Sequence, residues 1–203
     1  MDMSAIAPIP PYAALIFDCD GTLADTLPVH YQAWSEALQT FDAEMDCDWY
    51  LQHTGISTVD VVRILNETFG YDLDALLVKA EKHRRFQELI SRVTAIAPVA
   101  QIVEEHVGKV PMAIASGGTG YIVRQTLETI RLAHVFDVVV TSEDALHGKP
   151  APDLFLLAAE QLGVAPADCI VYEDSEAGLE AATRAGMRGI DVRSVWSSVL
   201  PCS

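Results

Sequence analysis

The stretch Ala13-Ala14-Leu15-Ile16-Phe17-Asp18-Cys19-Asp20-Gly21-Thr22 places two carboxylates at the end of a short apolar run. The run has the length and composition of a buried strand. Residues i and i+2 of an extended segment project to the same side, so Asp18 and Asp20 can share a metal ion or divide nucleophile and acid/base roles. Two carboxylates are costly to bury unless a cation holds them. A turn in which an Asp side chain merely closes the strand is the alternative interpretation.

Two later segments and one glycine-rich turn add the groups that such a pair of carboxylates needs. Gly148-Lys149-Pro150-Ala151-Pro152-Asp153 places a lysine before a proline-started helix. Ile170-Val171-Tyr172-Glu173-Asp174-Ser175 is a second apolar run that ends in two acids. Ser116-Gly117-Gly118-Thr119-Gly120 follows a further strand-like run, and its glycines allow an anion to approach a helix N-terminus closely. A turn that only connects strand to helix is the alternative interpretation of these glycines.

Strand-like runs alternate with helical patterns over most of the chain. This alternation predicts an α/β fold with a Rossmann-like parallel sheet, covered on both faces and with the first strand in the middle. Ligands of such sheets bind at the carboxyl ends of the strands. The expected strands are Ala13–Asp18, Pro111–Ser116, Asp137–Thr141, Cys169–Asp174 and Met187–Val192, and the expected helices are Val99–Val107, Tyr121–Leu132, Pro152–Leu162 and Ser175–Ala185.

The interval between the first two expected strands contains no convincing strand. It reads as helices at about Pro28–Leu38, Asp48–Gln52, Val59–Phe69 and Leu73–Ser91. An insert of this length predicts a small helical domain of its own. We therefore expect residues 1–24 and 96–203 to form the α/β catalytic core and residues 25–95 to form a helical cap. The last helix of this insert carries four basic side chains that we interpret as a solvated face; they are Lys79, Lys82, Arg84 and Arg85.

Composition narrows the classes of partner. The chain has 203 residues with a formal net charge of −16, which argues against nucleic acid and anionic membranes as partners. Its apolar runs fall far short of the roughly 18 residues that a membrane span needs. The four cysteines show no metal-type spacing, and we expect all four to be reduced in a cytoplasmic protein; they are Cys19, Cys47, Cys169 and Cys202.

In these motifs the chain resembles the haloacid dehalogenase-like hydrolase superfamily. The signatures occur in the family's order: the Asp-x-Asp-Gly-Thr box from Asp18, Ser116 after a strand, Lys149, and the acidic pair Glu173-Asp174. The chain is most similar to the β-phosphoglucomutase-like subfamily and, within it, to small sugar-phosphate phosphatases of the fructose-1-phosphate or 6-phosphogluconate type. The resemblance implies a four-helix cap, inserted after the first strand, that closes over the active site.

The resemblance also implies a mechanism. Asp18 would attack phosphorus and form an aspartyl phosphate, as carboxylates can. Asp20 would protonate the leaving oxygen and then activate water. Mg²⁺ would be held by Asp18, the backbone carbonyl of Asp20, and the pair Glu173 and Asp174, since it prefers oxygen ligands.

Further residues would bind the phosphate and the rest of the substrate. Ser116 and the backbone N–H of Gly117 would hold the phosphoryl group, and Lys149 would neutralise charge between it and the nucleophile. Thr22 lies just after the nucleophile box. His30 matches a histidine that positions the general acid in the mutase branch, although a structural role is equally compatible with the sequence.

The expected cap loop, Thr54-Gly55-Ile56-Ser57-Thr58, departs from the mutase pattern. The mutases place a lysine and an arginine where Thr54 and Thr58 stand, to grip the second phosphate of a bisphosphate. Gly55 is the substrate-binding candidate in this loop. The sequence therefore favours a monomeric Mg²⁺-dependent phosphatase of small phosphorylated metabolites. The alternatives are a β-phosphoglucomutase-like isomerase and a non-catalytic sensor of a phosphorylated metabolite.

Overall fold

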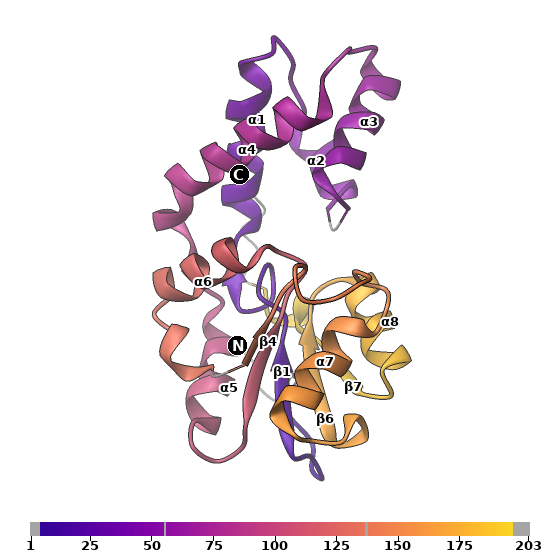
Figure 1. The fold of residues 1–203 in the computed structure, drawn as a ribbon. Helices are drawn as coiled ribbons and strands as arrows, with labels where there is room; N and C mark the ends of the chain where they lie inside the picture. The colour runs from indigo at the N-terminus through magenta and orange to yellow at the C-terminus, as the bar shows by residue number, and fades with distance from the viewer. Residues whose placement is uncertain (1–4, 55, 137, 197–203) are drawn as a thin grey trace. The chain divides into compact units, whose positions relative to one another are not determined.

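The computed structural model describes residues 5–54, 56–136 and 138–196, which divide into two compact units (Figure 1). One unit contains residues 5–25 and 93–196, and the other contains residues 26–92. The second unit thus starts at residue 26, where we expected 25, and ends at 92, where we expected 95. The role of the second unit as a cap stays a prediction.

The first unit is built on a parallel five-stranded sheet. The strand order is β5-β4-β1-β6-β7, so the first strand is central, as the alternation predicts. Every pairing in this sheet is parallel. The strands are β1 (Ala14–Phe17), β4 (Met112–Ala115), β5 (Val138–Val140), β6 (Cys169–Glu173) and β7 (Arg188–Asp191).

Helices cover both faces of this sheet, as Figure 1 shows. Leu15 and Phe17 point to one face and Ala14 and Ile16 to the other, because successive strand residues alternate in direction. On the first face Phe17 stacks on Tyr172 with ring centroids 4.8 Å apart. The first face packs on α5 (Ala97–His106) and α6 (Gly120–Thr129), and the second on α7 (Asp153–Leu162) and α8 (Glu176–Arg184).

A short antiparallel pair lies where the chain leaves and re-enters the first unit. It joins β2 (Ala24–Asp25) to β3 (Thr94–Ala95). The expectation of no strand over residues 25–95 is therefore wrong at both ends of that interval. Two-residue strands are too short to produce a periodic pattern, so they could not be predicted from the sequence.

The second unit is helical, as expected. Three of its helices begin at a side chain that accepts a hydrogen bond from the first turn: Asp46, Ser57 and Asp74. The helices are α1 (Leu27–Gln39), α2 (Cys47–Gln52), α3 (Thr58–Phe69) and α4 (Ala75–Leu89). They enclose their own core, which contains Trp34, Leu38, Ala43, Met45, Tyr50, Val61, Val62, Leu65 and Val78.

The cysteines differ in state. Cys19 and Cys169 are buried free thiols. Cys47 is disulfide-bonded, so the expectation that all four are reduced is wrong at this position. Pairing depends on distance in space, which spacing along the chain does not give. Cys202 lies outside the described residues. Within the described part of the chain, no helix is long and apolar enough to cross a bilayer.

Candidate active site

The predicted catalytic residues of the first unit gather at one edge of its sheet. Asp18 directly follows β1, Ser116 follows β4, and Glu173 ends β6. These three strands are neighbours and parallel, so their carboxyl ends meet. Lys149 reaches the same edge from the loop between β5 and α7. The residues that the sequence predicts for the site therefore lie together at the edge where ligands of such sheets bind, and their roles stay predictions.

Lys149 forms two ion pairs at this edge. Its Nζ lies 2.5 Å from Asp18 Oδ1 and 2.7 Å from Glu173 Oε2. All three side chains are almost completely buried, with 11%, 9% and 1% of the Lys149, Asp18 and Glu173 side chains exposed. Burial raises the pKa of Asp18 well above its ordinary value, and the Lys149 ammonium opposes that rise. Burial works to lower the pKa of Lys149, but its two acidic partners outweigh burial and raise the pKa.

Glu173 accepts several hydrogen bonds from the start of α8 as well. Its Oε1 accepts from the backbone N–H of Asp174 at 3.0 Å, from the N–H of Ser175 at 2.9 Å and from Ser175 Oγ at 2.8 Å. Burial works to raise the pKa of Glu173, but Lys149 and Ser175 outweigh it, and the pKa lies below its ordinary value. Glu173 is therefore a charged, tightly held carboxylate.

Asp174 is held against the turn that follows the nucleophile. Thr22 Oγ1 donates to Asp174 Oδ1 at 3.0 Å. Gly21 adopts φ +80°, and a Cβ placed there would lie 2.4 Å from Asp174 Oδ2, so only glycine fits between the turn and the carboxylate. The Gly21 carbonyl in turn accepts a hydrogen bond of 2.9 Å from Trp196 Nε1. Burial, followed by the charge of Glu173, raises the pKa of Asp174 to about 7.

The carboxylates fit a divalent cation. Oxygen atoms of Asp18, Glu173 and Asp174 all lie within 4.8 Å of one another. Carboxylate oxygens are the ligands that Mg²⁺ prefers. Burial and the charge of Glu173 together raise the pKa of Asp174, and Lys149 only partly opposes them. A bound cation would favour the charged carboxylates, and the donor set therefore suits Mg²⁺.

The glycine-rich turn lies beside the acid/base candidate. Ser116 Oγ accepts from the Gly118 N–H at 3.0 Å. A Cβ placed on Gly118 would lie 3.3 Å from Ser116 Oγ and 3.6 Å from Asp20 Oδ2, so these two side chains flank the same glycine. Gly117 is exposed at the tip of this turn. Asp20 and Ser116 thus lie on either side of Gly118, directly after Gly117, and the roles of the three candidates Asp20, Ser116 and Gly117 stay predictions.

A second loop supports this turn and was not anticipated from the sequence. Ser142 donates to the Gly118 carbonyl twice, from its backbone N–H at 3.1 Å and from Oγ at 3.0 Å. Glu143 accepts from the Gly120 N–H at 3.0 Å. The Glu143 carboxylate therefore already accepts a hydrogen bond from the backbone N–H of Gly120, the first residue of α6. An incoming phosphate would have to bind one turn earlier, next to Ser116 and Gly117.

The remaining two candidates, His30 and Gly55, belong to the part of the sequence between the first two sheet strands. His30 is in α1 of the second unit, where its ring stacks on Phe86 at 4.1 Å and its Nδ1 lies 3.1 Å from Lys82 Nζ. Lys82 also lies 5.9 Å from the centre of the Trp34 ring, so the interpretation of the basic cluster as a purely solvated face is wrong for this lysine. The sequence signal for this contact is the four-residue spacing of Lys82 and Phe86, which places both side chains on one helix face. Gly55 lies outside the described residues.

Known proteins resemble this chain along most of its length. The model of the haloacid dehalogenase-like hydrolase family matches residues 15–192. Fructose-1-phosphate phosphatase YqaB from Escherichia coli (strain K12) is 37% identical over 182 residues, which cover 90% of this chain and 97% of that protein. β-Phosphoglucomutase from Bacillus subtilis (strain 168) is 32% identical over 191 residues, covering 88% of this chain and 82% of the relative.

Solved structures share the fold. The structure of CbbY from Rhodobacter sphaeroides in complex with phosphate superposes with a TM-score of 0.78 at 25% sequence identity. The superposition covers 88% of this chain and 85% of that one. The sequence motifs, the sheet order and these matches agree, and the chain belongs to the haloacid dehalogenase-like hydrolase family.

Proposed function

We propose that this chain is a Mg²⁺-dependent phosphatase that hydrolyses small sugar phosphates through an aspartyl phosphate on Asp18. The observation that carries the proposal is the buried ion pair of Lys149 with Asp18, next to the further carboxylates Glu173 and Asp174. This arrangement supplies a nucleophile, a fixed cation and a metal-holding set within one small region. Relatives named as phosphatases of fructose 1-phosphate and of phosphorylated carbohydrates support the same reaction class.

The residues divide the work as follows. Asp18 attacks phosphorus, and Lys149 favours the charged form of its carboxylate and offsets the charge of the incoming phosphate. Asp20 gives a proton to the leaving oxygen and takes one from the water that cleaves the acyl phosphate. Ser116 Oγ and the Gly117 N–H donate to phosphoryl oxygens. Asp18, the Asp20 carbonyl, Glu173 and Asp174 would hold Mg²⁺, and the ion would neutralise charge on the transferring group.

Hydrolysis is favoured over isomerisation on one further ground. A mutase must hold a bisphosphate, and Thr54 and Thr58 supply no charge at the positions where the mutase branch carries cations. Thr54 Oγ1 instead donates to the Leu51 carbonyl at 3.2 Å, which closes its own turn. An isomerase is the second candidate function, because the relative from Bacillus subtilis is named as a β-phosphoglucomutase. We further propose that the protein is a cytoplasmic monomer. It would act on small metabolites and bind neither nucleic acid nor membrane.

The test is phosphate release from a panel of sugar monophosphates, with and without Mg²⁺. We expect ketose or sugar-acid monophosphates to release inorganic phosphate and EDTA to stop the reaction. Glucose 1-phosphate, with a bisphosphate primer, should give no glucose 6-phosphate in a coupled assay. A yield of isomer above the yield of free phosphate would replace the phosphatase with the mutase.

A further inference from the structure

The chain continues past the last sheet strand and returns to the edge where the candidate site lies. The match to the family model ends at residue 192, whereas the described chain runs on to Trp196. Directly after β7 it forms a short 3₁₀-helix, η5 (Val192–Val195). Trp196 follows η5, and its Nε1 donates to the Gly21 carbonyl at 2.9 Å. A residue beyond the family match therefore contacts the Asp18–Thr22 segment.

Two apolar side chains anchor the segment that carries Trp196. Val192 is fully buried and Val195 nearly so, and both belong to the core cluster that contains Phe17 of β1. Burial of apolar surface is the main force that holds so short an element in place. Trp196 thus extends from a support that shares its core with the strand before Asp18.

Charged side chains connect the same segment to α8. The Asp191 carboxylate accepts from the Arg193 N–H at 2.9 Å, which caps the start of η5. The Arg193 guanidinium pairs with Asp191 and, at 2.7 Å, with Glu176 at the start of α8. Exposed ion pairs such as these contribute little stability. Their effect is to join η5 to the helix that follows Asp174.

The carbonyl that accepts from Trp196 belongs to a buried, tight turn. Gly21 adopts φ +80°, and its N–H donates to the Ala24 carbonyl at 2.8 Å. The Gly21 carbonyl is part of the peptide unit shared with Thr22, whose Oγ1 donates to Asp174. Because a peptide unit is planar, holding this carbonyl also sets the direction in which Thr22 leaves the turn. Buried backbone carbonyls almost always have a partner, so the turn depends on a donor at this place.

We propose that Trp196 is a positioning residue for the reaction: its hydrogen bond holds the turn at Gly21, so that Asp20 and Asp174 on either side of that turn keep their places. The proposal rests on the phosphatase function proposed above. It gives a part in the reaction to a segment that the family match does not include. Trp196 would act only through the turn.

The first test compares two variants that weaken the protein in different ways. Trp196→Phe keeps an aromatic ring and removes the donor. Val103→Ala removes apolar contacts of α5 in the same core and leaves η5 and the turn intact. With a sugar monophosphate, Trp196→Phe should lower kcat about tenfold and leave KM within about twofold, since a misplacement of about 1 Å can cost about 100-fold. Val103→Ala should lower the melting temperature and leave kcat within about twofold of the parent.

Three results of this comparison would overturn the proposal. One is a kcat of Trp196→Phe within about twofold of the parent. Another is an equal loss of kcat in Val103→Ala, because the effect would then follow from stability alone. The third is a Trp196→Phe protein that does not fold, because Trp196 would then be a structural residue.

Amide exchange of the metal-free protein gives a readout that needs no turnover. In Trp196→Phe the Gly21 N–H, which donates to the Ala24 carbonyl, should exchange about tenfold faster, because local opening of the turn becomes easier. The Asp18 N–H donates to the Tyr172 carbonyl at 3.0 Å within the sheet and should keep its rate. Unchanged exchange at Gly21, or an equal rise at Asp18, would contradict the positioning role.

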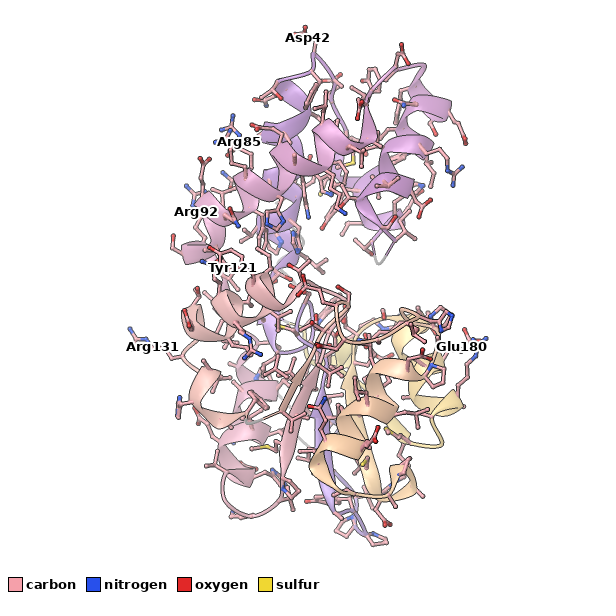
Figure 2. All side chains as sticks on the ribbon, viewed as in Figure 1. Asp42, Arg85, Arg92, Tyr121, Arg131 and Glu180 are labelled. Carbon is pink, nitrogen blue, oxygen red and sulfur yellow. The ribbon has the colours of Figure 1, made fainter. Side chains whose placement is uncertain are left out.

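A surface change on α8 completes the design. Glu180 lies on the outer side of this helix (Figure 2), in an exposed ion pair with Arg184. Glu180→Ala should alter neither kcat, nor KM, nor exchange at Gly21. If the parent releases no phosphate, the proposed function fails, whereas the exchange measurement still decides whether Trp196 holds the turn.

Discussion

Asp18 combines burial with a single cationic partner, and its replacement tests the reaction directly. Asp18→Asn keeps the shape of the side chain and cannot act as a nucleophile, so turnover should be abolished. The variant should melt no lower than the parent in metal-free buffer, because burial and the charges of Glu173 and Asp174 oppose ionisation of Asp18. Steady-state assays and melts followed by circular dichroism check both statements. Turnover within about tenfold of the parent would exclude the aspartyl phosphate.

The pKa of Asp174 predicts how the metal-free protein responds to pH. The folded-state pKa of about 7 lies above the ordinary value near 4. Between these two values the folded protein binds a proton that the unfolded chain has lost, so stability falls as pH rises through this window. In EDTA the melting temperature should be lower at pH 8 than at pH 5, and Mg²⁺ should restore most of the difference at pH 8.

Asp174→Asn provides the comparison for this titration. This change should reduce the dependence of the melting temperature on pH. The dependence that remains is expected from Asp18, whose pKa is also raised. A parent protein that melts higher at pH 8 than at pH 5 in EDTA, or a variant with the parent's slope, would contradict the assignment.

Among the elements, the turn after β1 depends most strictly on one residue. Gly21→Ala meets both a positive φ and the carboxylate of Asp174, 2.4 Å from the added carbon. Gly163 is a matched control, since its φ is +69° and nothing lies within 4 Å of an added Cβ. Both changes should carry the backbone strain of alanine at positive φ, roughly 1 kcal/mol. Only Gly21→Ala should also weaken Mg²⁺ binding in a calorimetric titration; equal binding by the two variants would refute the clash.

The elements that carry a periodic pattern could be predicted from the sequence. The five sheet strands and the four helices of the second unit fall within or close to their expected ranges, because apolar runs and capping residues are local signals. The β2–β3 pair could not be predicted, since two residues define no period. The positions of Asp18 and Asp174 could be predicted because the ends of parallel strands converge, whereas Lys149 lies in a loop and was expected only from its place among the family's signatures.

Other parts of the site depend on distances between segments that are remote in sequence. Glu173 could be predicted as an acid near the site, and its contact with Gly178 could not, because the contact depends on the path of a side chain in space. The supporting contacts of Ser142 and Glu143 are of the same kind. A glycine inside a helical pattern is the one local signal that pointed to such a contact.

At the scale of the whole molecule, the described part of the chain passes between the two units twice, at residues 25–26 and 92–93. The proposed reaction must exclude water while the acyl phosphate forms and must later release its product. We expect a fluoride complex that mimics the phosphoryl group, with Mg²⁺, to reduce the radius of gyration in solution scattering. Hydrogen exchange should slow in residues 26–92 on the same treatment. Unchanged profiles with the ligand demonstrably bound would argue for a site that stays open.

The hydrogen bond from Trp196 to Gly21 gives the protein an intrinsic optical reporter. The chain has three tryptophans, and the other two, Trp34 and Trp49, belong to the helical unit. With both replaced by phenylalanine, all remaining indole emission would come from Trp196. Its ring is hydrogen-bonded to the turn that follows Asp18 and Asp20. Occupancy of the site could then be followed by fluorescence on the time scale of a single turnover, without a label.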